Sequence, residues 1–298
     1  MLEIKKYGAI DIGSNAIRLL ISNIILKEGR DPQFKKSSLV RVPIRLGADA
    51  FVSGIISEEN TTRMINAMEA FKLLMQVHHV ERYKACATSA MREAKNGAEI
   101  VEKVFNQTGV KINIIGGKEE AEIISSTDLN ELISGDSSYL YVDVGGGSTE
   151  FTIFSGGKII TSKSFKMGTV RLLSNKKSVN KEIFTNVEKW IKKKTKNLKN
   201  VSLIGSGGNI NKLFKMSGRT EGKPISFIYL NAQYQFLKQM SYQERISELS
   251  LNPDRADVIV PATKIYLSAM KWSGARKIYV PKIGLSDGII KSLYYNEL

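Results

Sequence analysis

The sequence predicts an α/β protein made of two similar domains. Its 298 residues are about twice the usual size of one domain, so each half is long enough to bury a core of its own. The same opening pattern occurs twice, about 132 residues apart: an apolar strand that carries an Asp near its end, a turn rich in Gly and Ser, and a second apolar strand. We therefore expect a duplicated α/β fold with a cleft between the two copies.

The first domain opens with a predicted hairpin. Residues 7–26 contain an apolar strand, a turn at residues 13–15 and a second apolar strand. A helix is predicted over residues 58–77, because Ser57 can cap it and large apolar residues recur at the spacing of one buried helix face. These apolar residues are Met64, Met68, Phe71 and Met75.

Two further strands of the first domain are each followed by a predicted helix. A short strand over residues 83–87 precedes one helix, and a strand over residues 111–115 leads into another, from about residue 118 to residue 134. Gly135 ends that helix, so the domain boundary is expected there. The two predicted domains are residues 1–135 and residues 136–298.

The second domain repeats the opening of the first. An apolar strand over residues 139–144, a turn at residues 145–149 and a returning strand over residues 150–154 match the plan of residues 9–15 and the strand after them. A third Gly-rich turn, over residues 203–209, precedes another helix. The repeat supports the duplication.

The charge of the chain predicts a polyanionic partner. Residues 151–227 contain 17 Lys and Arg against 3 Asp and Glu, so most of the net charge of +15 belongs to the second domain. Residues 189–199 predict a helix that turns Trp190 and Ile191 toward the body and its lysines toward solvent. These lysines are either a solvated face or an attractive field around a polyanion site.

Several other classes of protein are disfavoured. The one cysteine, Cys86, argues against a disulfide framework, and its place in an apolar strand predicts a core residue. The adjacent His78 and His79 do not form a metal pair, because neighbours on a helix point about 100° apart. No segment has the pattern of a signal peptide or a membrane span. We therefore expect a cytoplasmic protein with no membrane partner.

An Asp followed by Gly-rich backbone is a pattern that binds phosphate and metal. Glycines let main-chain N–H groups approach phosphate oxygens, and nearby hydroxyls add donors. Asp11 and Asp143 are therefore expected to hold Mg²⁺, which prefers one or two carboxylates together with substrate phosphates. One such turn alone can be an ordinary hairpin, whereas two in register favour function. The residues expected at phosphate in the three turns are Gly13, Ser14, Asn15, Gly145, Gly146, Gly147, Ser148, Thr149, Gly207 and Gly208.

Carboxylates and arginines complete the predicted site. Glu119 and Glu120 lie in the first turn of a predicted helix, where they either complement the helix dipole or remove a proton from attacking water. Glu150 is a polar residue at the start of a strand and is expected to position Mg²⁺ or the same water. Arg18 and Arg92 are candidate phosphate clamps, since a guanidinium matches phosphate geometry, with surface ion pairs as the alternative.

Seven motifs occur along the chain in a fixed order. They are Asp11-Ile12-Gly13-Ser14-Asn15 with Arg18-Leu19, Ala87-Thr88-Ser89-Ala90 with Arg92, Gly117-Lys118-Glu119-Glu120-Ala121, Asp143-Val144-Gly145-Gly146-Gly147-Ser148-Thr149-Glu150, Gly168-Thr169-Val170-Arg171-Leu172, Gly205-Ser206-Gly207-Gly208, and Arg255-Ala256-Asp257 with Pro261. From residue 9 to about residue 290, the chain resembles the exopolyphosphatase / guanosine pentaphosphate phosphohydrolase family.

The resemblance implies two ribonuclease-H-like domains of the sugar kinase/Hsp70/actin superfold around a central cleft. It implies that Glu120 is the catalytic base and that Asp143 and Glu150 serve the divalent ion and the attacking water. It also implies a phosphate path lined by residues 11–18 and by residues 88–92, which include Thr88, Ser89 and Arg92.

Many members of the family continue into a helical C-terminal region of the HD-hydrolase type, which lengthens the path for a polymer and helps dimerisation. This sequence ends at Leu298. Without that C-terminal region, we expect shorter polyphosphate or a nucleotide polyphosphate as substrate. A homodimer is left open.

The leading hypothesis is a Mg²⁺-dependent phosphoanhydride hydrolase that acts on inorganic polyphosphate, with guanosine pentaphosphate as the alternative substrate. A kinase of the same superfold is a second class. A nucleic-acid binder is a third, although no helix-turn-helix, zinc-finger or RNA-recognition pattern is present, so no specific nucleic-acid partner is expected.

Overall fold

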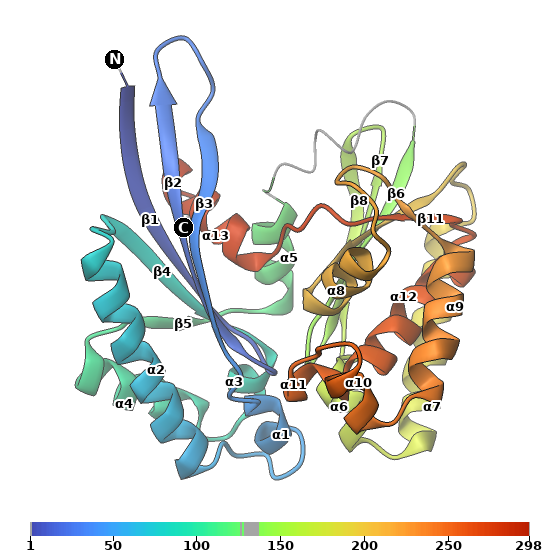
Figure 1. Ribbon diagram of the computed structural model, residues 1–298, viewed down its shortest axis with the longest axis horizontal. Coiled ribbons are helices and arrows are strands. Elements are labelled where there is room, and N and C mark those ends of the chain that lie inside the picture. The colour runs from blue at the N-terminus through green and yellow to red at the C-terminus, as the bar shows by residue number, and fades with distance from the viewer. Residues whose placement is uncertain (1, 126, 128–136, 298) are drawn as a thin grey trace. The chain divides into compact units, whose positions relative to one another are not determined.

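The chain forms two compact α/β units, each built around its own sheet. The computed structural model describes residues 2–125, 127 and 137–297 (Figure 1). Unit 1 contains Met1–Thr127 together with Leu285–Leu298, and unit 2 contains Asp128–Gly284. Among the helices of the described ranges, none combines the length and the apolar character that crossing a membrane requires.

The sheet of unit 1 has the strand order β3-β2-β1-β4-β5. The predicted hairpin is confirmed as the antiparallel pair β1 and β2, whereas β4 and β5 run parallel to β1. The third strand, β3, pairs antiparallel to β2 and was not predicted, because its polar and charged residues hide the alternation of a strand. The strands are β1 (Leu2–Ile12), β2 (Ile17–Lys27), β3 (Gln33–Val42), β4 (Arg82–Ala87) and β5 (Ile112–Ile114).

One face of this sheet packs on helices α2 and α4. The helix predicted over residues 58–77 is confirmed with those bounds, and the Ser57 hydroxyl accepts a hydrogen bond from the Asn60 N–H at 3.3 Å. The predicted apolar stripe of α2 is buried against Ile10 and Ile12 of β1. The helices of unit 1 are α1 (Leu46–Ala50), α2 (Glu58–Val77), α3 (Ser89–Glu93), α4 (Gly97–Thr108), α5 (Gly117–Ser125) and α13 (Leu285–Tyr295).

The last helix, α13, packs on β1, β2, β4 and α5 (Figure 1). A Cβ at Gly288 would lie 2.1 Å from the Ile123 carbonyl oxygen, so only glycine lets α13 approach the backbone of α5 this closely. Lys36 of β3 forms an ion pair with Asp287 at 2.8 Å, and the ring of Tyr294 meets the ring of Phe34 edge-on at 5.6 Å. These contacts tie α13 to unit 1.

The observed units differ from the predicted domains at the C-terminus. The division into residues 1–135 and 136–298 gave the last helix to the second domain, whereas its contacts place Leu285–Leu298 in unit 1. The physical reason is the apolar and ionic contact of α13 with strands that precede it by about 200 residues or more, which no local pattern reveals. The helix predicted to residue 134 is described as α5 up to Ser125, and its predicted end at Gly135 lies outside the described residues.

Unit 2 repeats the strand plan of unit 1, which confirms the predicted duplication. Its sheet has the order β10-β11-β9-β6-β7-β8, so β6 corresponds to β1, β7 to β2, β8 to β3, β9 to β4 and β11 to β5. The directions agree as well: β6 pairs antiparallel with β7 and parallel with β9. The strands are β6 (Ser138–Val144), β7 (Thr149–Ser155), β8 (Lys158–Phe165), β9 (Ser202–Ser206), β10 (Ile225–Ser226) and β11 (Lys277–Tyr279).

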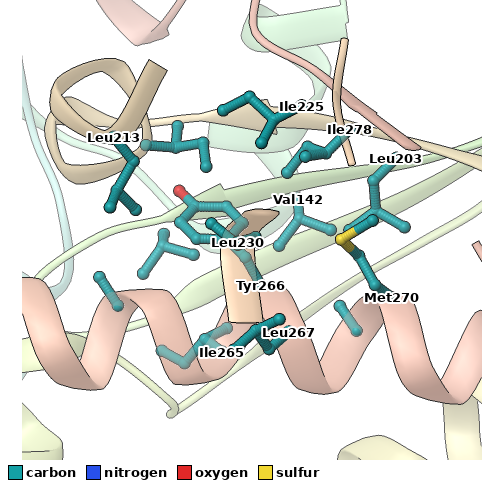
Figure 2. Close-up of a cluster of buried hydrophobic side chains, with 14 of the residues drawn as sticks. Val142, Leu203, Leu213, Ile225, Leu230, Ile265, Tyr266, Leu267, Met270 and Ile278 are labelled. Carbon is teal, nitrogen blue, oxygen red and sulfur yellow. The ribbon is translucent and has the colours of Figure 1, made fainter. Parts of the chain in front are cut away.

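The core of unit 2 joins this sheet to its helices and surrounds Tyr266 of α12 (Figure 2). The basic helix is α7. Its buried Ile191, partly buried Trp190 and exposed lysines confirm the prediction, but the helix ends at Thr195 and not at residue 199. The helices are α6 (Thr169–Ser174), α7 (Lys177–Thr195), α8 (Gly208–Met216), α9 (Phe227–Gln239), α10 (Tyr242–Ser247), α11 (Pro253–Ala256) and α12 (Ile259–Ser273).

Cys86 is the buried core residue that the sequence predicts, and we expect it to be unreactive. Burial, and after it the negative charges of Asp11, Glu119 and Glu120, raise the pKa of the thiol from 9.0 to about 12, although Lys84 opposes the shift. Iodoacetamide at pH 8 should therefore label Cys86 only after unfolding in urea.

The same shift predicts a dependence of stability on pH. The unfolded thiol ionises near pH 9 and the folded thiol does not, so its contribution to stability is complete below pH 9 and is lost as the pH rises toward 12. The loss should appear in urea unfolding of the wild type as an excess over Cys86→Ala. Equal pH profiles for the two proteins would contradict it.

Candidate active site

The two hairpin turns are built alike. In unit 1 the Gly13 N–H donates to the Ala16 carbonyl at 3.2 Å, and in unit 2 the Gly145 N–H donates to the Ser148 carbonyl at 3.0 Å. Asp11 and Asp143 each precede their turn by two residues. The two motifs therefore match in their main-chain geometry as well as in their sequence.

A short helix after the third strand holds the carbonyl groups of each turn. In unit 2, α6 follows β8, and the main-chain N–H groups of Thr169 and Val170 donate to the carbonyls of Gly145 and Gly146 at 3.0 and 2.9 Å. Arg171 adds a bond from its Nε to the Gly147 carbonyl at 2.8 Å. Three successive carbonyl groups of the turn thus point toward α6.

The corresponding contacts in unit 1 come from the start of α1. The N–H of Gly47 donates to the Ser14 carbonyl at 2.8 Å, and the N–H of Arg45 donates to the Asn15 carbonyl at 3.1 Å. Arg45 holds a left-handed conformation with φ of 61°, which is uncommon for a side chain of this size.

These bonds fix where the N–H groups of the turns point. In a trans peptide the C=O of one residue and the N–H of the next lie on opposite sides of the unit. The N–H groups of Gly146, Gly147 and Ser148 are therefore directed away from α6 together. Successive main-chain N–H groups turned to one side form a concavity that binds anions.

The contact between α6 and the turn leaves no room for a side chain. A Cβ at Gly168 would lie 2.2 Å from the Gly146 carbonyl oxygen, and a Cβ at Gly47 in unit 1 would lie 2.9 Å from the Cβ of Ser14. Gly168 and Gly47 are therefore needed for close approach of the backbone, not for a left-handed conformation.

The hydroxyl groups expected at phosphate all have protein partners. Ser14 and Ser89 share a hydrogen bond at 3.0 Å. The Thr88 hydroxyl donates to the Ile12 carbonyl at 3.4 Å, the Thr149 hydroxyl donates to the Met167 carbonyl, and the Ser148 hydroxyl donates to Glu150 Oε1 at 2.6 Å. These side chains brace the turns. The hydroxyls of Thr88, Ser148 and Thr149 direct their protons at protein oxygens, so the main-chain N–H groups are the main donors left to meet a ligand.

A row of polar side chains crosses the sheet of unit 1 beside its turn. Asp11 is in register with Arg18 on one neighbouring strand and with Cys86 on the other, and Arg18 is in register with Arg41. Arg18 Nη1 donates to Asp11 Oδ2 at 2.7 Å. Asp11 therefore has an ion-pair partner within unit 1, and its predicted role as a metal ligand stays a prediction.

The two predicted residues Glu120 and Arg92 lie on elements that follow β5 and β4. Glu120, in the first turn of α5, is 8 % exposed, whereas Glu119 is exposed. Asp11 is in register with Cys86 at the end of β4, and β4 pairs with β5, the strand that precedes the helix of Glu120. Arg92 Nη1 donates to the Ile115 carbonyl at 2.6 Å, just before α5 begins, so Arg92 holds the start of the helix that carries Glu120.

Two carboxylates form the corresponding row in unit 2. Asp143 of β6 is directly in register with Glu150 of β7, and Glu150 is 2 % exposed. Glu150 Oε1 accepts hydrogen bonds from the hydroxyls of Ser148 and Ser164, at 2.6 and 2.8 Å. Like charges directly opposite each other are destabilising, and a divalent cation relieves that repulsion.

The donor chemistry of this pair fits Mg²⁺. The ion takes oxygen ligands and is commonly held by one or two carboxylates together with substrate phosphates. Among the described residues there is no group of three or more acidic, His or Cys side chains that could enclose a metal alone. Asp143 and Glu150 are therefore the residues that would hold the ion, with substrate oxygens completing its shell.

The third predicted turn lies next to Asp143 and begins a helix. Gly207 has φ of +115°, and a Cβ there would lie 3.0 Å from the Val144 carbonyl oxygen and 3.5 Å from Asp143 Oδ1. Helix α8 starts at Gly208, whose carbonyl accepts a hydrogen bond from Arg255 Nη1 at 3.2 Å. The first N–H groups of α8 have no partner within the helix and are suited to an anion.

The predicted site residues thus fall into two groups. Unit 1 brings together Asp11, Arg18, Glu120 and the turn at residues 13–15, and unit 2 brings together Asp143, Glu150 and the other two turns. Sequence reasoning gave no role to Arg41, Arg45, Gly168 and Arg171. Gly168 and Arg171 belong to the motif of residues 168–172. The signal that could have revealed their role is a glycine directly before a short helix.

The comparisons with known proteins decide the family. The model of the Ppx/GppA phosphatase family matches residues 36–297. The chain belongs to the Ppx/GppA phosphatase family. It is 26 % identical to exopolyphosphatase 2 of Mycobacterium tuberculosis, with 98 % of this chain and 99 % of that protein covered.

Two more relatives place the family match in context. The chain is 30 % identical to a bifunctional 3-dehydroquinate synthase/phosphatase of Fusobacterium nucleatum over 92 % of its own length, and it spans 44 % of that protein. A crystal structure of an exopolyphosphatase from Cytophaga hutchinsonii has the same fold, with a TM-score of 0.86 at 23 % identity and 98 % of each chain covered.

The close approach of α6 to the second turn of this Ppx/GppA protein can be tested by adding one methyl group. Gly168→Ala should lower the free energy of unfolding by roughly 1–3 kcal/mol in urea, because its Cβ overlaps the Gly146 carbonyl. Gly116→Ala is the control, since its Cβ has nothing within 4 Å and should change stability far less. Equal stability of Gly168→Ala and the wild type would contradict the described contact.

Proposed function

We propose that the chain is a Mg²⁺-dependent exopolyphosphatase that releases the terminal phosphate of inorganic polyphosphate. The observation that carries the proposal is the turn of unit 2, whose three N–H groups are directed together beside the carboxylate pair Asp143 and Glu150. Such a turn binds phosphate oxygens, and such a pair binds the cation that accompanies them. The substrate class is supported by the family and by the full-length likeness to a protein named exopolyphosphatase.

The turns and one arginine would stabilise charge on the phosphoryl group. The N–H groups of Gly146, Gly147 and Ser148 are held in place before substrate arrives, so they stabilise developing charge without reorganisation. Arg18 offers a guanidinium on the polar row of unit 1. Mg²⁺, when bound at Asp143 and Glu150, would supply Lewis-acid polarisation of the phosphoryl oxygens.

Glu120 is proposed as the general base. Its carboxylate takes a proton from water while the water oxygen forms a bond to the terminal phosphorus, and the bridging P–O bond breaks in line with the attack. The products are orthophosphate and a chain one phosphate shorter, and the proton on Glu120 then leaves to solvent. The low exposure of Glu120 limits competition from bulk water.

Guanosine pentaphosphate is the second candidate substrate, and the third turn favours it. The N-terminal end of α8, next to Gly207 and Gly208, is a typical site for the phosphates of a nucleotide. We prefer polyphosphate because the exposed lysines of α7 suit a polymer of phosphates. A kinase of the same fold would require an acceptor other than water.

Phosphate release without added acceptor tests the proposal. Wild-type protein is mixed with short polyphosphate, long polyphosphate or guanosine pentaphosphate, with Mg²⁺ or with EDTA. We expect Mg²⁺-dependent release that is fastest on a polyphosphate. Release from guanosine pentaphosphate alone would select the second candidate, and no release from any of the three would reject both.

The base is tested by Glu120→Gln. Removing a general base lowers kcat by about 10²–10⁴-fold. Glu119→Gln, at the exposed neighbouring position on α5, should keep kcat near the wild-type value. A Glu120→Gln protein that hydrolyses as fast as wild type would eliminate Glu120 as the base.

The preference for a polymer is tested on the lysines of α7. Lys193→Glu with Lys196→Glu should lower kcat/KM for long polyphosphate by about tenfold at low salt, because it removes attraction of a polyanion, and should leave guanosine pentaphosphate hydrolysis nearly unchanged. Lys238→Glu, an exposed residue of α9 outside the basic stretch, is the control. Equal losses on both substrates would argue against a role in chain binding.

A further inference from the structure

Tyr266 is a polar side chain in the middle of the apolar core of unit 2. It lies on α12, is fully buried and is surrounded by apolar side chains that include Val142, Leu213 and Ile265 (Figure 2). A hydroxyl group in such surroundings lowers stability unless it is hydrogen-bonded. The partners of this hydroxyl therefore indicate why a tyrosine stands here.

This hydroxyl lies at the ends of two strands. It donates to the Ser206 carbonyl at the end of β9. It also lies beside Val144 at the end of β6, because a Cβ at Gly207 would be 3.3 Å from the Tyr266 oxygen and 3.0 Å from the Val144 carbonyl oxygen. Gly207 follows Ser206 directly and opens the third turn, and Gly145 follows Val144 directly and opens the second. The Tyr266 oxygen is thus bonded to the residue before the third turn and lies beside the residue before the second.

The hydroxyl is also close to the predicted metal ligand. A Cβ at Gly207 would lie 3.3 Å from the Tyr266 oxygen and 3.5 Å from Asp143 Oδ1, so both atoms border the same point of the third turn. The Asp143 carboxylate is near enough to act electrostatically on the phenol. A shift of either strand end would move Asp143 and the turns relative to each other.

We propose that Tyr266 is a positioning residue that holds the second and third Gly-rich turns in a fixed relation around Asp143. The proposal rests on the proposed function for its catalytic consequence, whereas the joining of the two turns stands on the contacts alone. Tyr266 reaches the strand ends from α12 through the core and does not touch substrate.

Tyr266→Phe removes the hydroxyl and keeps the ring that fills the core. We expect kcat for polyphosphate to fall about tenfold with KM changed little, since misplaced groups lower kcat and kcat/KM together when their contacts matter in the transition state. The melting temperature should also fall, because the Ser206 carbonyl loses a buried partner.

Thr263→Val is the matched control. Thr263 lies on α12 one turn before Tyr266, is fully buried, and donates its hydroxyl to the Ile259 carbonyl within the helix at 2.7 Å. This variant also loses a buried hydroxyl, so its melting temperature should fall, but its kcat should stay at the wild-type value. A tenfold loss of kcat in both variants would show that the loss follows from lowered stability alone, and it would overturn the proposal.

Amide hydrogen exchange tests the joining of the turns without any activity. Exchange in peptides that cover residues 144–150 and residues 205–210 should rise together in Tyr266→Phe and stay unchanged in Thr263→Val. Unchanged exchange in Tyr266→Phe would overturn the proposal even if the enzyme is an exopolyphosphatase. If the wild type releases no phosphate from any substrate, the proposed function fails, and the exchange result still decides the role of Tyr266.

Discussion

The planarity of the peptide unit is the constraint on which the candidate site depends. Because C=O and N–H leave a trans peptide on opposite sides, a helix that captures the carbonyl groups of a turn also fixes the direction of its N–H groups. In this chain α1 and α6 do so for the two hairpin turns. Gly47 and Gly168, the buried hydroxyls and Arg171 all support that one arrangement.

The two copies have kept this arrangement and differ in the charges beside it. Arg18 in unit 1 stands at the strand position that Glu150 occupies in unit 2, each in register with the Asp of its own copy. The first pair is an ion pair at 2.7 Å, whereas the second consists of two carboxyl groups. The two copies therefore share one backbone plan and differ in the side chain that stands opposite their Asp.

Local patterns predicted the two hairpins and several helices, whereas β3 and the contacts between elements were beyond local patterns. The hairpins and α2 follow from the apolar periodicity of short segments and from the cap at Ser57, so the sequence alone was sufficient for them. The role of Gly168 depends on two segments more than twenty residues apart, and that of Tyr266 on strand ends that are far away in sequence. Ser148 shows the same limit. A serine in a Gly-rich turn predicted a hydroxyl that donates a hydrogen bond to phosphate, whereas this hydroxyl donates to Glu150.

The placement of α13 in unit 1 has a consequence for biosynthesis. The ribosome makes β1 first and α13 last, and residues 128–284 must be synthesised before unit 1 receives the helix that packs on β1, β2 and β4. At about 5–20 residues per second, this interval lasts roughly 10–30 s. During that time the strands of unit 1 expose the surface that α13 will cover, including the ring of Phe34. The nascent N-terminal sheet is then a natural client for a chaperone, even though every one of its own strands has already left the ribosome.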